Sequence, residues 1–465
     1  MTPRSTRRKV VQPVSHCARD HPARRSARHG RPERGGAVPP EVVSILALVA
    51  CFVVATTLSV NMGVLAFAAA FLVGTLAGGL SEDEIFAGFP GDIFVVLVGV
   101  TYLFAIARAN GTTDWLVRWS VRLVGGRLAV LPWVMFGIAA LLTAIGAVSP
   151  AAVAIVAPIA LNLAARHGIN PLLMGAMVVH GAQAGGFSPI SVYGVIVNGV
   201  VAGNRLPGSP LVLFAGSFAV NLVIAGVVFV ALGGIRLVRA AATVGAPAPS
   251  GGADSTDADV APTEDPRLNR DRVCTLLGLA ALVVTTLGFG LDVGLVAMTV
   301  AVVLTLISPK AAAGAPAEVT WPTVLLICGV LTYVGVLQEM GTIDYVGNAV
   351  ATVGIPLLAA LLLCYIGGVV SAFASSVGLM GALIPLAVPF LTTGSIGAVG
   401  MVTALAVSST VVDVSPFSTN GAIVLANAKG VDREVFFRRL LVYGAIVTAV
   451  APAVVWLVFV VPGLG

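Results

Sequence analysis

Long apolar runs separated by short polar stretches are the feature that most limits what this chain can fold into. Of its 465 residues, 58% are hydrophobic and 10% are charged, whereas soluble domains carry about 25% charged residues. A water-soluble core cannot bury so many apolar side chains, so lipid must solvate much of the protein. The sequence therefore predicts an all-α protein that crosses the membrane many times.

The charged side chains are concentrated in two segments. Residues 1–41 and 236–272 together hold 24 of the 47 charged residues. The first segment is rich in Arg, Pro and Ser and is expected to be a disordered basic tail, and the second is a polar linker. The formal net charge of the whole chain is +5. Residues 1–41 alone have a net charge of +7, so the rest of the chain has a net charge of −2. The basic balance therefore indicates no nucleic-acid partner.

Four short motifs recur in the same order at offsets of 227 to 231 residues. The pairs are Asn61-Met62-Gly63 with Asp292-Val293-Gly294, Gly111-Thr112-Thr113-Asp114-Trp115 with Gly341-Thr342-Ile343-Asp344-Tyr345, Ser149 and Pro158 with Ser376 and Pro385, and Ser188-Pro189-Ile190-Ser191 with Ser415-Pro416-Phe417-Ser418. The sequence thus predicts two homologous halves, 42–235 and 273–465, joined by the cytoplasmic linker 236–272.

Each half is predicted to contain five membrane-spanning helices and one re-entrant hairpin, about ten spans and two hairpins in total. An odd number of crossings per half inverts the second half, as in many secondary transporters. When loops are assigned alternately to two sides, one side holds 15 Lys/Arg and the other holds one, which identifies the cytoplasmic side. The ten Lys/Arg of residues 1–41 conflict with this orientation. A start codon upstream of the true one, or a miscounted span, would remove the conflict.

Serine–proline pairs mark the interruptions in the apolar segments. They are Ser149-Pro150, Ser188-Pro189 and Ser415-Pro416, with Ser375-Ser376 at the corresponding point of the second half. Serine favours the N-cap and proline the first helical position, so four helices are predicted to begin inside the bilayer. Their N-termini would present about +2 of effective charge to a small dianion, with a coupling cation beside it. Simple kinks in packed helices are the alternative.

Two ionisable side chains lie within the apolar segments. Asp413 is the only charged residue clearly inside such a segment, and an intramembrane carboxylate is a candidate ion ligand or proton carrier. His180, the only histidine in a span, either carries a proton or packs as a satisfied core residue. The sequence has no Walker lysine motif and no HExxH or GxSxG motif, so neither an ATP-driven pump nor a familiar enzyme is expected.

Three segments of the first half are similar to one known family. Residues 59–74 (SVNMGVLAFAAAFLVG), 88–104 (GFPGDIFVVLVGVTYLF) and 180–198 (HGAQAGGFSPISVYGVIVN) resemble the MatC-type dicarboxylate carriers. These carriers belong to the ion transporter superfamily, together with the divalent anion/sodium symporters. The resemblance implies a scaffold domain, a moving transport domain with elevator-type alternating access, a homodimer, and a substrate such as malonate, malate or succinate.

The resemblance also implies which residues bind substrate. The symporters have Ser-Asn-Thr at each hairpin tip, and the matching positions here are Ser149-Pro150-Ala151 and Ser375-Ser376-Val377. Only the serines are kept, which leaves both Na⁺ and H⁺ open as coupling ions. The unwound-helix motif matches Ser188-Pro189-Ile190-Ser191 and Ser415-Pro416-Phe417-Ser418-Thr419-Asn420.

These observations together predict a cation-coupled secondary transporter of small dicarboxylates in the bacterial inner membrane, with no cofactor beyond the coupling Na⁺ or H⁺. Two alternatives stay open. The first is a cation/proton antiporter of the same architecture, in which Asp413 is the exchange site. The second is the large membrane subunit of a binding-protein-dependent dicarboxylate transporter.

Overall fold

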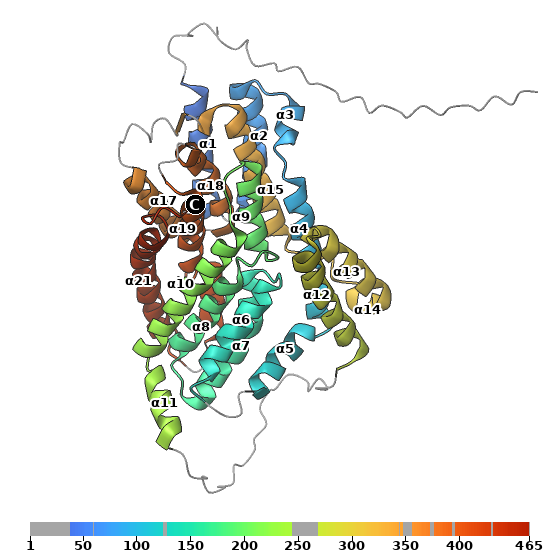
Figure 1. Cartoon of the computed structure of the whole chain (residues 1–465), viewed down its shortest axis with the longest axis vertical. Coiled ribbons are helices and arrows are strands. Elements are labelled where there is room, and N and C mark those ends of the chain that lie inside the picture. The colour runs from blue at the N-terminus through green and yellow to red at the C-terminus, as the bar shows by residue number, and fades with distance from the viewer. Residues whose placement is uncertain are drawn as a thin grey trace, which may run out of the picture. The chain divides into compact units, whose positions relative to one another are not determined.

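Helices are the only regular elements in the part of the chain that the structure describes (Figure 1). The computed structural model describes residues 38–58, 60–123, 128–243, 268–343, 345–346, 356–372, 376–392, 396–428 and 431–464. Residues 1–37 of the predicted tail, residues 244–267 of the predicted linker, and Ser375 lie outside the described residues. Contacts group Pro40–Gly465 into one unit.

The helices of the first half follow the predicted apolar segments closely. They are α1 (Pro40–Thr57), α2 (Met62–Val73) with the π-helix η1 (Gly74–Gly78), α3 (Glu82–Ala87), α4 (Gly91–Ala109), α5 (Thr112–Leu123), α6 (Leu131–Ala144), α7 (Ser149–His167), α8 (Pro171–Gly185), α9 (Val192–Gly203), α10 (Pro210–Ala231) and α11 (Gly234–Thr243). Helix α11 (Gly234–Thr243) includes the first residues of the segment 236–272 that the sequence predicts as a linker.

The described helices of the second half repeat this order. They are α12 (Arg270–Phe289), α13 (Val293–Ile307), α14 (Pro309–Ala312), α15 (Trp321–Glu339), α17 (Pro356–Ser371), α18 (Ser376–Thr392), α19 (Ala398–Val411), α20 (Thr419–Asn427) and α21 (Arg433–Phe459). The repeated motif acts as a cap in both halves. The Asn61 side chain accepts from the Gly63 N–H at 2.9 Å, and Asp292 accepts from the Leu295 N–H at 2.8 Å, so α2 and α13 start at matching positions.

Six helices in the described part of the chain are long and apolar enough to cross a membrane. They are Gly91–Ala109, Ser149–His167, Pro210–Ala231, Arg270–Phe289, Trp321–Glu339 and Arg433–Phe459. Several of them expose large apolar side chains, such as Val223 and Val227 of α10 and Val450 and Val454 of α21, which suits contact with lipid. The predicted all-α membrane fold is therefore confirmed. The ten spans and two re-entrant hairpins stay predictions.

Helices of one half pack on helices of the other half in reciprocal pairs. Helix α15 packs on α2, and α4 packs on α13. A Cβ atom added to Gly329 would lie 2.0 Å from the carbonyl oxygen of Gly63, and one added to Gly99 would lie 2.6 Å from the carbonyl oxygen of Gly294. Glycine is therefore needed where these backbones touch. Gly63 and Gly294 are 231 residues apart, and Gly99 and Gly329 are 230 apart, which are the offsets of the sequence repeat.

Other contacts between equivalent helices are unequal. Helix α15 packs along α18, whereas the equivalent helices α4 and α7 do not pack along each other. Conversely, α4 packs on α9, and the equivalent pair α15 and α20 does not form such a contact. Helices α6, α7 and α8 lie side by side, and α17, α18 and α19 pack together in the same way (Figure 1). The three-helix groups α6–α8 and α17–α19 thus have the same internal packing. The halves differ in which helices α4 and α15 contact: α15 packs along α18, whereas α4 packs on α9.

Candidate functional site

Two long helices are interrupted at equivalent points. Helix α8 ends at Gly185 and α9 begins at Val192, while α19 ends at Val411 and α20 begins at Thr419. The serines of the two Ser-Pro pairs were expected to cap the second helices. The structure places the caps three residues later, at Ser191 and Ser418, because the backbone continues to turn after each proline before it enters the helix.

The two interruptions have the same hydrogen bonds. Ser191 Oγ lies 2.5 Å from the carbonyl oxygen of Gly186 and 2.7 Å from that of Ser188, and it accepts from the Gly194 N–H at 3.2 Å. A Cβ atom on Gly194 would lie 2.0 Å from the carbonyl oxygen of Ser188. The Ser191 hydroxyl therefore bonds both to the turn before it and to the helix after it. The position three residues later must be glycine, because a Cβ atom there would collide with the turn.

In the second half, Ser418 Oγ lies 2.7 Å from the carbonyl oxygens of both Asp413 and Ser415, and it accepts from the Gly421 N–H at 3.3 Å. The hydroxyl of Ser415 accepts from the Phe417 N–H at 3.3 Å. Its counterpart Ser188 accepts from the Ile190 N–H at 3.5 Å. These hydroxyls stabilise the turns that contain Pro189 and Pro416 rather than the helix ends.

The first hairpin also differs from the expected capping. Ser149 is the first residue of α7, its N-cap is Val148, and no side chain caps the helix. Pro150 lies in the first turn, as expected. The Ser149 hydroxyl instead accepts from the Asn420 side-chain amide at 2.9 Å. In the second hairpin α18 begins at Ser376, whose hydroxyl accepts from Ser371 at 2.7 Å.

Asp413 lies at the centre of the polar groups that the two halves contribute. Its side chain is buried, and its Oδ2 accepts from the Gln183 amide at 3.1 Å and from the Asn420 amide at 3.3 Å. The Ser376 hydroxyl lies against the same carboxylate. The structure thus brings together Ser149, Ser376, Asp413 and Asn420 of the predicted site and adds Gln183. No ion pair to Asp413 forms within the described residues.

Two amide oxygens beside Asp413 have no partner in the described part of the chain. They are Gln183 Oε1 and Asn420 Oδ1, and both are buried. A buried acceptor without a donor costs about 1–3 kcal/mol. A cation could be held by these oxygens together with the Asp413 carboxylate, since oxygen donors suit hard cations. Groups of three or more His, Cys, Asp and Glu side chains that could bind a metal do not occur among the described residues.

His180 belongs to a separate network. Its ring is fully buried, with Nδ1 2.9 Å from Asn221 Oδ1 and Nε2 2.5 Å from the Tyr443 hydroxyl. The network reaches the main site only through backbone. Ser217 donates to the Gln183 carbonyl at 3.2 Å, and Asn221 donates to the Ser217 carbonyl at 2.9 Å. His180 therefore does not contact Asp413.

Sequence reasoning did not assign Gln183, Asn221 or Tyr443 to a site. A signal was present for the first two, because polar amides inside long apolar helices need partners and mark interior faces. Tyr443 carries no such signal, since tyrosine is common in spanning helices. Its role becomes visible only when α21 is placed beside α8.

Residues 38–186 match the family model described as the dicarboxylate carrier protein MatC N-terminus. The chain therefore carries a MatC N-terminal domain. This domain contains α6 and α7, which form the predicted first hairpin, and all of α8, and it ends at the first helix interruption. The resemblance predicted from the sequence is therefore confirmed for residues 38–186.

One solved structure supports the same assignment for the fold. The crystal structure of the Alcanivorax borkumensis YdaH transporter, described as having an unusual topology, matches with a TM-score of 0.57 and 14% sequence identity. The match covers 90% of this chain and 98% of that chain. It shows that this chain shares the overall fold of that transporter. No curated protein matches the sequence.

Proposed function

We propose that the protein is a secondary active transporter that couples transport of small dicarboxylates, such as malonate, malate or succinate, to Na⁺ or H⁺. The observation that carries the proposal is the position of Asp413. It is buried within the second helix interruption, without an ion pair among the described residues, next to two amide oxygens that have no partner among those residues. The MatC family description supports the substrate class.

The helix N-termini provide the anion site. Helices α7, α9, α18 and α20 begin beside the hairpin turns and interruptions, and the first residues of α7, α18 and α20 contact Asp413 or its partners. Each N-terminus carries about +0.5 of effective charge and several free N–H groups. A small dianion matches about four such ends. Ser149, Pro150, Ser188, Pro189, Ser191, Ser375, Ser376, Ser415, Pro416, Ser418, Thr419 and Asn420 are the residues we propose for this site.

Asp413 provides the cation site. Burying an unpaired carboxylate costs several kcal/mol, and a bound Na⁺ or a proton would remove most of that cost. Gln183 Oε1 and Asn420 Oδ1 would complete a Na⁺ site. A bound cation beside the helix N-termini also places a positive charge next to the anion, so that each favours binding of the other. His180 is linked to Gln183 through Asn221 and Ser217, and it does not contact Asp413, so we propose a secondary role for it in proton coupling.

The unequal contacts of α4 and α15 support elevator-type alternating access between two inverted repeats of five spans each. If the two halves exchange roles, α4 would pack along α7 as α15 now packs along α18. Thr101 and Ala154 are the equivalents of Leu331 and Gly381, and a Cβ atom on Gly381 would lie 3.4 Å from Leu331 Cδ2. In a cysteine-free background, Leu331→Cys with Gly381→Cys should cross-link in the present state. Thr101→Cys with Ala154→Cys should cross-link only in the opposite state.

If both cysteine pairs cross-link, and each cross-link blocks transport, the exchange of contacts between α4 and α15 is supported. The motion is ruled out if the Thr101→Cys with Ala154→Cys pair never cross-links during turnover. We further propose that the transporter works as a homodimer in the bacterial inner membrane, with lipid around α10 and α21.

The decisive test of function is uptake into proteoliposomes. Purified protein is reconstituted and supplied with radiolabelled malonate, malate or succinate, while Na⁺ and pH gradients are imposed separately. Uptake driven by one of the gradients is the expected result. Absence of uptake of all three substrates under both gradients would contradict the proposal. Uptake by the purified chain alone would also show that no binding-protein partner is required.

The cation/proton antiporter is the second candidate, because the same buried Asp413 could exchange cations alone. It predicts Na⁺-dependent proton movement across the same vesicles in the absence of any dicarboxylate. Our proposal predicts that cation flux requires the dicarboxylate. Measuring Na⁺ flux with and without succinate separates the two functions.

A further inference from the structure

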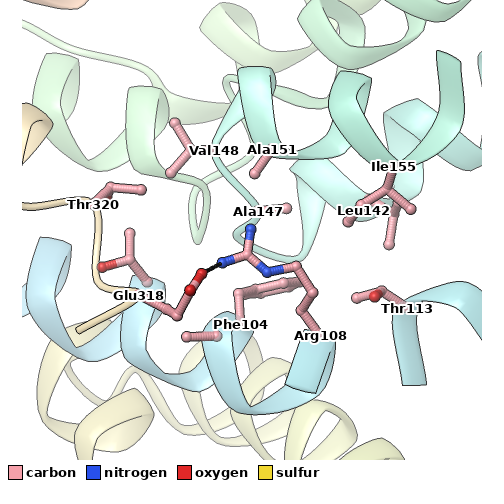
Figure 2. Close-up of a pocket in the computed structure, with 12 residues that line it drawn as sticks. Phe104, Arg108, Thr113, Leu142, Ala147, Val148, Ala151, Ile155, Glu318 and Thr320 are labelled. Carbon is pink, nitrogen blue, oxygen red and sulfur yellow. Dashed lines mark hydrogen bonds and ion pairs between the residues drawn. The ribbon is translucent and has the colours of Figure 1, made fainter. Parts of the chain in front are cut away.

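A second pocket, largely apolar with a few polar groups, lies beside the turn between α6 and α7, between α4, the start of α5 and the segment that leads into α15 (Figure 2). Its polar lining residues are Thr101, Arg108, Thr113, Glu318 and Thr320. The hairpin turn contributes Ala147 and Val148 to the same pocket. The pocket occupies the gap where α4 and α7 do not pack along each other.

Arg108 and Glu318 face each other across this pocket. The Arg108 guanidinium donates to the Glu318 carboxylate, and their side chains are 42% and 60% exposed. An ion pair this exposed contributes about 0–1 kcal/mol, so another carboxylate can replace Glu318 at little cost. A guanidinium binds carboxylates in a planar two-point geometry. Arg108 is thus an anion-binding group whose present partner is weakly held.

Two further features of the pocket favour a negatively charged ligand. Thr113 is 2% exposed and lines the pocket, and its hydroxyl is buried without a partner in the described part of the chain. The hydroxyl of Thr320 is also buried and unpartnered within the described residues. Val148 and Ala151 bring the N-terminus of the 19-residue helix α7 to the same wall. In Figure 2 the Arg108 guanidinium lies between Glu318 and the hairpin turn, with Thr113 on the other side.

We infer that this pocket is an access site for one carboxylate group of the transported dicarboxylate. The incoming carboxylate displaces Glu318 from Arg108 and accepts from the Thr113 hydroxyl in front of α7. The hairpin turn separates this pocket from the main site, because the next residue, Ser149, is hydrogen-bonded to Asn420. Glu318 acts as a built-in competitor that neutralises Arg108 when substrate is absent. The inference rests on the proposed function and adds a specificity-determining residue to it.

The test measures KM for radiolabelled succinate in proteoliposomes. Arg108→Gln removes the charge and should raise KM about tenfold, as loss of a charge-assisted hydrogen bond does. Glu318→Gln removes the competitor and should lower KM severalfold. Thr113→Val should raise KM about threefold with an unchanged melting temperature, because its hydroxyl has no protein partner to lose. Arg438→Gln, which breaks an exposed Arg–Glu pair on α21, is the control and should leave KM unchanged.

The charge-swapped double variant, Arg108→Glu with Glu318→Arg, separates substrate binding from a structural latch. If the pair only holds the pocket shut, the swap restores the wild-type KM and overturns the inference. We expect KM to stay raised. A higher KM in Glu318→Gln would also overturn the inference, and this variant serves if Arg108→Gln does not fold. Because wild-type uptake is measured in parallel, failure of the proposed function would be recognised separately.

Discussion

The interruptions after α8 and α19 have matching backbones and different side chains. In both, a serine caps the second helix and bonds back to two carbonyl groups, and a glycine follows where no Cβ fits. With the offset of 227 residues, Gly186 corresponds to Asp413 and Tyr193 to Asn420. The shared backbone supplies equivalent helix N-termini, which suit an anion. The differing side chains place a carboxylate and an amide in one half only, so cation binding is expected to be asymmetric.

The largest effect is expected from Asp413→Asn. The amide keeps the shape of the side chain and removes the negative charge, so the site can neither release a proton nor neutralise Na⁺. We expect the gradient-driven uptake rate to fall about 100-fold, with the protein still folded, as measured with labelled succinate under each gradient. Unchanged cation dependence would remove Asp413 from the coupling site.

The shared backbone of the two interruptions predicts that equivalent glycine substitutions destabilise the protein to the same extent. A Cβ atom on Gly421 would lie 1.9 Å from the carbonyl oxygen of Ser415, and one on Gly194 would lie 2.0 Å from that of Ser188. Gly421→Ala and Gly194→Ala should each destabilise the protein by about 1–3 kcal/mol or more, visible as a lower melting temperature in detergent. Gly226→Ala, on α10 with open space around it, is the matched control. If only one of the two substitutions lowers the melting temperature, the interruptions are not structurally equivalent.

The differing side chains predict that substitutions at the equivalent positions Tyr193 and Asn420 have unequal effects on cation affinity. Asn420 donates to the Asp413 carboxylate, whereas Tyr193 lies against Ser149. Asn420→Ala should weaken the apparent affinity for the coupling cation about tenfold, because a hydrogen bond to a charged group is lost. Tyr193→Phe should leave that affinity unchanged. Titration of succinate uptake against Na⁺ concentration or pH measures both, and equal effects would refute the asymmetric cation site.

The smallest effect is expected at Ser188 and Ser415. Among the described residues, their hydroxyls accept from backbone N–H groups at 3.5 and 3.3 Å. Ser188→Ala and Ser415→Ala should each change the KM for succinate by less than about threefold, in line with the loss of one weak neutral hydrogen bond. A tenfold rise in KM for either variant would show that the hydroxyl itself binds the substrate, and that the residue does more than shape the turn.

Much of this site could be predicted from local sequence. The Ser-Pro pairs located both interruptions, since proline and a capping serine act within a few residues. The caps themselves were placed three residues too early, at Ser188 and Ser415 instead of Ser191 and Ser418. A Ser-Pro pair followed by Ser-x-x-Gly is compatible with either serine as the cap, and only the path of the backbone decides between them.

Contacts between the halves could not be predicted. Gln183 reaches Asp413 across 230 residues of sequence, and Arg108 reaches Glu318 across 210. Such pairs depend on how helices of one half are rotated and shifted against those of the other half. Apolar periodicity does not fix that register in segments that are apolar on all sides. Asp413 itself was recognisable, because a lone carboxylate in an apolar segment needs partners wherever they come from.

The most direct test of the central claim measures succinate binding to the purified protein by calorimetry, at several Na⁺ concentrations and pH values. The account predicts that the succinate Kd of the wild-type protein falls as one of these cations increases, because cation and anion bind side by side. The same titration of Asp413→Asn should give a Kd that does not depend on either cation. A wild-type cation dependence that persists in Asp413→Asn would contradict the account.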